Sequence, residues 1–132
     1  MTAAFVMALV LTSSLIVVQR GFQAIDTARY TTLAGQILQS QMEKLRLLTW
    51  SQLNSITATT FTPDVSNSSA QIANFTSCTQ SISPDTSAPY NSTMINITLT
   101  ANWRGADNRP HTLSYFTRYG QNGISDFFYT AH

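Results

Sequence analysis

Two side chains near the end of the chain have the types and spacing of an acid–base pair. His111 follows Asp107 by four residues and stands beside Pro110. An imidazole and a carboxylate within hydrogen-bond reach could transfer a proton. The surrounding Gly-Ala-Asp-Asn-Arg-Pro run, however, is typical of a solvated turn. No nucleophile elbow accompanies the pair. The sequence therefore predicts no catalytic residues and no enzyme activity.

Cys78 is the only cysteine, so an intrachain disulfide is impossible and a cysteine-based metal site cannot form. No His or Arg stands near it in the sequence, so we expect a small buried residue rather than a reactive thiol. His111 and His132 are far apart, and no phosphate-cradling glycine loop is present. The sequence predicts no metal and no cofactor. Asn-X-Ser/Thr sequons occur at Asn67, Asn74, Asn91 and Asn96. In a chain this rich in Asn, Ser and Thr, such sequons are expected by chance.

The composition argues against nucleic acid as a partner. The net charge is +1 and only 10% of the 132 residues are charged, so no basic surface for nucleic acid is evident. Ser and Thr make up about a quarter of the chain. Such an uncharged, hydroxyl-rich composition favours a protein exposed outside the cell.

The rest of the chain is organised around its N-terminal stretch, which the sequence predicts to be one long helix. Ala3 to Val18 carries no charged residue, and no proline occurs before Pro63. Between Ala34 and Leu48 the apolar residues recur with helical spacing, interrupted only by a glutamine. We therefore predict residues 1–20 as a hydrophobic transmembrane or filament-core helix, 21–50 as its amphipathic continuation, and 51–132 as a globular β-sheet head.

The head is predicted from alternating patterns. Residues 93–104 form the clearest strand, and residues 111–119 follow it across a turn as the second arm of a hairpin. A further strand is expected within 71–82 and a short one within 57–62, while the remainder of 49–69 is expected to be loop. The aromatic tail at 127–129 is either a last strand or a strip across the sheet. Helix first and strands afterwards predict an α+β fold, with the C-terminal half of the helix on a small antiparallel sheet of three to four strands.

The sequence predicts two groups of apolar residues, a core for the head and an interface on the helix. The predicted core of the head comprises Ile37, Leu45, Leu48, Ile95, Ile97, Leu99, Trp103, Leu113 and Tyr115. The predicted assembly interface on the first half of the helix comprises Ala3, Phe5, Val6, Leu9, Val10, Leu15, Ile16, Val18, Phe22 and Ile25. An apolar helix left in water would be untenable, so a membrane or a bundle of identical helices must cover it.

The N-terminal residues resemble type IV pilins and the pseudopilins of type II secretion. The resemblance lies in Thr2–Trp50, above all in Ala3–Leu11, Leu15–Gln19 and Ala34–Arg46. It implies a membrane-inserted precursor, cleavage by a dedicated peptidase, and assembly by an ATP-driven machine into a helical filament. The C-terminal hairpin is similar, less specifically, to the small heads of minor pilins.

Two features of that family are missing from the sequence. Neither the basic leader with its glycine nor the glutamate at the fifth mature position is present, and the first acidic residue is Asp26. The apolar run of sixteen residues would span roughly 24 Å, less than the ~30 Å of a hydrocarbon core. We expect Met1 to correspond to about the sixth or seventh mature residue, which would explain both differences and the short span.

The resemblance implies a structural subunit of a type IV pilus-like filament, located in the inner membrane as a precursor and then at the cell surface. The expected partners are further copies of the chain, other pilins and the inner-membrane assembly machinery. Two alternatives remain open at this point: a minor pilin or pseudopilin of a secretion or DNA-uptake machine, and a membrane-anchored binding domain that never polymerises.

Overall fold

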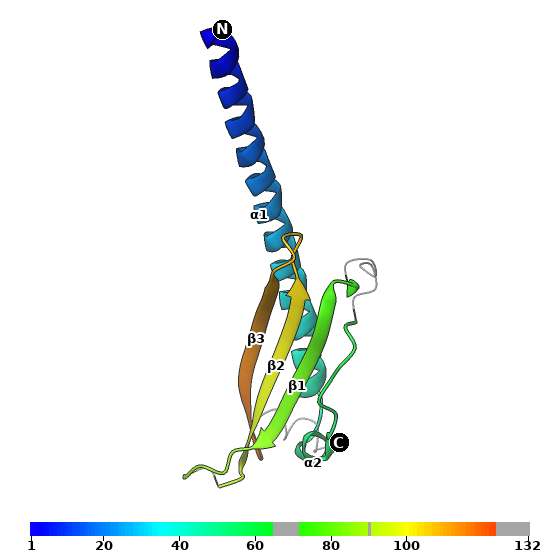
Figure 1. Ribbon diagram of the computed structural model, residues 1–132. Helices are drawn as coiled ribbons and strands as arrows, with labels where there is room; N and C mark the ends of the chain where they lie inside the picture. Colours follow the sequence, from blue (N-terminus) through cyan, green and yellow to red (C-terminus); the bar gives the residue numbers. More distant parts are fainter. Residues whose placement is uncertain (65–71, 90, 124–132) are drawn as a thin grey trace.

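A long helix, a short helix and a small sheet are the regular elements of the described residues. The structure is a computed structural model that describes residues 1–64, 72–89 and 91–123. Its elements are α1 (Thr2–Arg46), α2 (Trp50–Ser55), β1 (Phe75–Pro84), β2 (Met94–Arg104) and β3 (Pro110–Gly120). The strands form one antiparallel sheet in the order β1-β2-β3. Figure 1 shows α1 lying along the sheet and continuing far beyond it. The predicted α+β class and its layout are confirmed.

The end of the long helix differs from the prediction. A single helix to about residue 50 is wrong, because α1 ends at Arg46 and a separate helix, α2, begins at Trp50. The cause is Thr49, which caps α2 from extended backbone (φ −75°, ψ 164°) and so cannot continue α1. Its hydroxyl accepts from the Gln52 amide, and the Gln52 side chain accepts from the Thr49 amide at 3.0 Å. The predicted loop therefore contains a helix.

The β2–β3 hairpin follows the alternation in the sequence. Ile97 is paired with Ile82 of β1 on one side and with Thr117 of β3 on the other. The first strand is shifted from its predicted position within 71–82, because its ladder with β2 runs from Phe75 to Pro84. The short strand expected within 57–62 is reduced to a bridge between Thr60 and Thr79.

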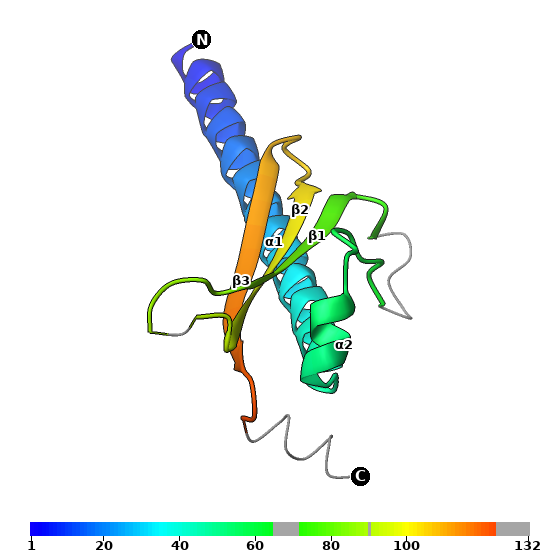
Figure 2. The same cartoon turned by 90° about the horizontal axis from the view of Figure 1, so that it is seen from below.

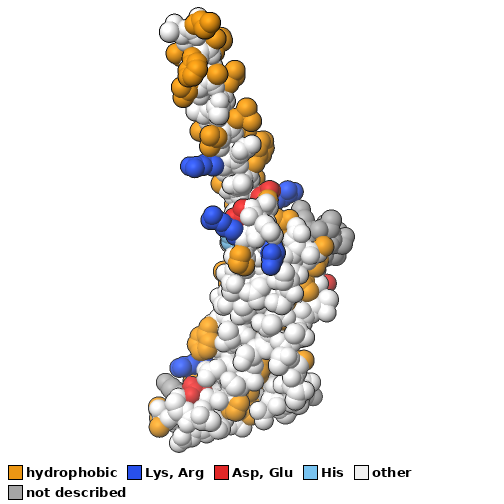
Figure 3. Space-filling view, viewed as in Figure 1, with side chains coloured by type: hydrophobic (Ala, Val, Ile, Leu, Met, Phe, Trp, Pro, Cys, Tyr) orange, Lys and Arg blue, Asp and Glu red, His pale blue; other side chains and the backbone are white. Residues whose placement is uncertain are grey.

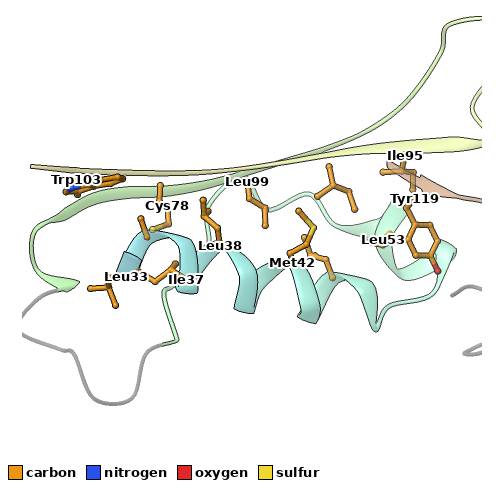
Figure 4. Close-up of a cluster of buried hydrophobic side chains, with 14 residues drawn as sticks. Leu33, Ile37, Leu38, Met42, Leu53, Cys78, Ile95, Leu99, Trp103 and Tyr119 are labelled. Carbon is orange, nitrogen blue, oxygen red and sulfur yellow. The ribbon is translucent and has the colours of Figure 1, made fainter. Parts of the chain in front are cut away.

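The core lies between the second half of α1 and one face of the sheet. Figure 2 shows from below how α1 lies behind the strands. Ile37, Leu45, Ile95, Ile97, Leu99 and Trp103 are buried there, whereas Leu48, Leu113 and Tyr115 are partly buried against the cluster. Figure 4 shows Trp103 and Leu33 at one end of the cluster, and Tyr119 with Leu53 of α2 at the other. Further members outside the predicted core set are Leu33, Ala34, Leu38, Met42, Leu53, Ala101 and Tyr119, and Cys78 is buried as expected.

A tight loop joins β2 to β3 beside α1. Asn108 has φ 58° and its amide donates to the Gly105 carbonyl at 2.9 Å. Asparagine tolerates this left-handed conformation better than other non-glycine residues. A Cβ at Gly105 would lie 2.6 Å from Asp107 Oδ1 and 3.0 Å from His111 Nε2, so a larger residue there would displace these two side chains. The aromatic tail at 127–129 lies outside the described residues.

Candidate functional site

The first half of α1 is a bare apolar surface. All ten residues of the predicted assembly interface are exposed, among them Phe5 at 77%, Leu9 at 64% and Phe22 at 65%. Figure 3 shows these orange side chains projecting from the part of α1 that extends beyond the head. Burying one Val, Leu, Ile or Phe side chain contributes about 1.5–3 kcal/mol. Covering this surface therefore contributes as much as the ~5–15 kcal/mol net stability of a typical domain, so the surface must be covered in the working state.

The apolar surface surrounds the helix and is not limited to one stripe. Met7, Leu11 and Val17 were not among the predicted interface residues, yet they are exposed to a similar extent, at 71%, 64% and 68%. The signal that could have found them is the absence of any charged residue between Ala3 and Val18. A helix that is apolar on all sides needs an apolar environment on all sides.

The hydroxyl groups within the apolar run are satisfied by the helix itself. Thr12 Oγ1 donates to the Ala8 carbonyl at 2.6 Å, and Ser13 and Ser14 each donate to the Val10 carbonyl, at 2.9 and 2.8 Å. Such back-bonding leaves no hydroxyl donor unpaired. These three residues are thus compatible with lipid, and as small polar residues they also suit close contact with a neighbouring helix.

By length and composition α1 is able to cross a membrane. An 18-residue window of it has a mean hydropathy of 2.0, and none of that window is buried in the head. Residues 2–18 rise about 26 Å at 1.5 Å per residue, close to a ~30 Å hydrocarbon core. Arg20 follows after Gln19, and a long basic side chain at a span end can extend to the interface.

The apolar half is rigidly joined to the head, because the same helix supplies the head's core. The helix runs without interruption from Thr2 to Arg46, and Leu33, Ile37, Leu38 and Leu45 are buried under the sheet. Thr27, Thr31 and Thr32, between the two halves, bond back to carbonyls of the preceding turn and leave the helix intact. A flexible linker is therefore absent from this junction.

The residues whose types could support chemistry, Asp107, His111 and Cys78, lie in the head, where they contribute to its structure. His111 Nε2 is 3.7 Å from Asp107 Oδ1, and the imidazole stacks on the Trp103 ring at 5.7 Å. The Arg109 amide donates to Asp107 at 3.0 Å, and this bond is the largest cause of the lowered pKa of the Asp107 carboxyl. Burial opposes the lowering, and the nearby His111 and Arg109 side chains add to it. Asp107 lies in the β2–β3 loop, where its carboxylate accepts from the Arg109 amide, and His111 lies at the start of β3 opposite Trp103. Cys78 is 6% exposed, and burial raises the pKa of its thiol.

The remaining candidate positions form no site together. Asn74 donates to Tyr30 Oη at 2.5 Å, Asn91 is in an exposed loop, and Asn96 lies within β2 and accepts from Arg118 at 3.1 Å; Asn67 is outside the described residues. The part of the chain that the structure describes holds no group of three or more His, Cys, Asp or Glu side chains placed for a metal ion. A hollow of about 560 Å³ beside β1 is lined by residues 56–59, Thr and Ser side chains of the sheet, Gln80 and Ile82.

Sequence reasoning missed the polar contacts that fix the helix on the sheet. Gln41 Nε2 donates to Gln80 Oε1 at 3.0 Å, and Gln80 Nε2 donates to the Ala58 carbonyl at 3.1 Å. Gln41 interrupts the apolar stripe, which could have signalled a buried polar partner. Nothing in the sequence indicates that the partner is a residue 39 positions later.

The long N-terminal helix packs on a small antiparallel sheet and leaves its apolar first half bare, and this arrangement is a pilin-like layout. Comparisons with protein-family models, with curated proteins and with solved structures found no match to this chain.

Proposed function

We propose that this protein is a structural subunit of a type IV pilus-like filament. The single observation that supports the proposal is the division of α1 into an exposed apolar half and a half that is the core of the head. A simple anchor needs a span and a boundary. It does not need the span to continue without a break into the folded domain.

Two environments satisfy the apolar half equally well. In the membrane, lipid chains would surround all of its sides, and the bonded hydroxyls of Thr12, Ser13 and Ser14 would cost little. In a filament, the apolar halves of neighbouring copies would replace the lipid. The subunit would thus wait in the inner membrane and then pass into a cell-surface filament, with other copies and the assembly machinery as partners.

Site-specific crosslinking combined with electron microscopy tests this proposal. Leu9 and Ile16 would be replaced singly by Cys in a Cys78→Ala background, and intact surface filaments would be treated with an oxidant. We expect crosslinks between copies in filaments and none after dissociation in detergent. Thr98, in the middle of β2 and between the buried Ile97 and Leu99, provides the matched control because it belongs to the head and not to α1's bare half.

Purified filaments that lack this chain as a repeating unit would contradict the proposal. Crosslinks that are absent from intact material would instead favour a membrane-anchored domain that does not polymerise. The number of copies per filament distinguishes a main subunit from a low-copy component of a secretion or DNA-uptake machine.

A further inference from the structure

Arginines gather where the bare half of α1 meets the head. Arg20 and Arg29 lie on α1, and Arg104 and Arg109 flank the β2–β3 loop; we call these four residues the basic collar. Figure 3 shows most of the blue side chains on that face at this junction. Figures 1 and 2 both place the loop beside α1, on the side toward its N-terminus.

Hydrogen bonds fix the height of the loop along the helix. Asn74 contacts both elements, since its side chain donates to Tyr30 Oη at 2.5 Å and its carbonyl accepts from the Arg104 amide at 3.1 Å. The loop therefore sits near the level of Arg29 and Tyr30. Nine residues of helix, about 14 Å, separate Arg29 from Arg20. The collar thus occupies one short section of the molecule.

The charge of this section differs from that of the rest of the chain. The four arginines share it with two acidic residues, Asp26 and Asp107, whereas elsewhere in the described part of the chain three basic residues accompany three acidic ones. All four arginines are exposed, and Arg109 has a side-chain exposure of 82%. Asp26 is half-buried, and the Asp107 side chain is 27% exposed and engaged by its own loop. The arginine side chains of this section are therefore more exposed to solvent than its two carboxylates are.

We infer that the basic collar binds the anionic headgroups of a phospholipid surface and seats the head on the membrane before assembly. This inference rests on the membrane stage of the proposed function. The apolar half ends at Arg20, so a membrane that covers residues 2–18 brings its headgroup layer to the collar. Basic residues next to a span are attracted to anionic lipid within about a Debye length.

The experiment uses the full chain in vesicles of phosphatidylcholine, with or without phosphatidylglycerol. A fluorophore at Ala106, introduced as Ala106→Cys with Cys78→Ala, reports approach to a headgroup-bound quencher. A second label at Val10, read with an acyl-chain quencher, reports insertion. We expect insertion in both lipids but close approach of residue 106 only in the anionic one, with the approach lost at high salt.

The variants separate charge from loop structure. Arg104→Gln/Arg109→Gln should lower the docked-to-undocked ratio about fivefold per arginine, and Arg104→Lys/Arg109→Lys should restore it. Lys44→Gln/Arg46→Gln removes the same charge at the other end of the head and should leave the ratio unchanged. Inorganic phosphate should displace the head no more than chloride does at equal ionic strength.

Equal approach of residue 106 in both lipids would overturn the inference while leaving the proposed function intact. An equal loss in the Lys44/Arg46 variant would also overturn it, as would selective displacement by phosphate, which would indicate a free-anion site. Failure of the Val10 label to insert in either lipid would overturn both this inference and the membrane stage on which it depends.

Discussion

At the scale of single residues, buried polar groups determine how the head holds together. Gln80 is 7% exposed and bonds both Gln41 of α1 and the Ala58 carbonyl of the segment after α2. Asp85 is 6% exposed; Ser87 donates to it through its amide, at 3.0 Å, and through its hydroxyl. Because water has little access to these groups, each is costly to leave without its partner.

Gln41→Leu should destabilise the head because it leaves Gln80 Oε1 without its donor. The expected loss is about 1–3 kcal/mol in the free energy of unfolding, the usual cost of a buried polar group left unsatisfied. Gln39→Leu, on the exposed face of α1, is the matched control and should change little. Chemical denaturation in detergent, followed through tryptophan fluorescence, measures both variants. Equal effects of the two substitutions would show that the amide pair is unimportant.

Asp85 should make the head sensitive to acid. The Ser87 hydroxyl and then the Ser87 amide lower the pKa of the Asp85 carboxyl, burial opposes them, and Arg118 and Asn96 assist. A carboxyl with a lowered folded-state pKa adds stability above its unfolded-state value, about 3.9, and loses it as pH falls through the folded-state value. Asp85→Asn should therefore weaken the head at neutral pH and flatten the fall in stability below about pH 4.

Denaturation curves measured across that pH range test the Asp85 prediction. Asp64 is the comparison: Lys44 lowers its pKa too, but the pair is exposed, with its atoms 2.7 Å apart. Asp64→Asn should have a smaller effect at neutral pH, since exposed ion pairs contribute little. An unchanged acid limb in Asp85→Asn would refute the assignment.

At the scale of elements, α1 is continuous and α2 is an independent short helix with its own cap. The cap depends on Thr49, so Thr49→Ala should cost about 1 kcal/mol of stability, and Thr49→Ser should restore it. Leu53 of α2 is fully buried in the core, so the loss should appear in global unfolding. Thermal unfolding of the three proteins measures it, and a Thr49→Ala protein as stable as the parent would contradict the role of the cap.

Gly21 is the second place where an element can be tested. It lies within α1, and a Cβ there would meet nothing within 4 Å. Gly21→Ala should stabilise the local helix by about 1 kcal/mol, the difference in helix propensity. A Cβ at Gly35 would lie 3.3 Å from Tyr115 Oη, so Gly35→Ala should gain less. Amide hydrogen exchange around each position provides the measurement, and an equal gain at both would contradict this difference.

The elements show what the sequence could predict and where it failed. The absence of proline before Pro63 and the helical spacing of apolar residues between Ala34 and Leu48 predicted α1. The alternation at Ile95–Trp103 predicted the central strand, and both periodic signals are local. α2 was missed because its signal is a two-residue cap, Thr49 with Gln52, within a Ser- and Thr-rich segment. The position of β1 depends on its pairing with β2, and the Gln41–Gln80 contact depends on tertiary packing. Neither is encoded locally.

At the scale of the whole molecule, the protein is divided between an apolar rod and a hydroxyl-rich head. A charge placed in the rod should prevent both proposed environments. Leu9→Glu should abolish filaments and reduce membrane insertion, since an acidic residue at the centre of a span costs about 2.5–3.5 kcal/mol. Phe116→Glu, at a residue 61% exposed on the head, is the matched control.

Filament yield by electron microscopy and the membrane fraction of the protein measure these variants. We expect Leu9→Glu to form no filaments and to have a smaller membrane fraction, and Phe116→Glu to keep its membrane fraction. Normal filaments built from the Leu9→Glu protein would remove the assembly role from the apolar half.

The unbroken helix also sets how the molecule would carry tension. Forty-five residues form one rod about 68 Å long, and β2 and β3 run lengthwise beside its second half in both views (Figures 1 and 2). Force applied along α1, between its N-terminal end and the sheet, would slide all the buried side chains of α1 along the sheet together, rather than separating them one at a time. Loading in shear distributes the force over the whole core, so the head resists extension along the rod better than peeling across it.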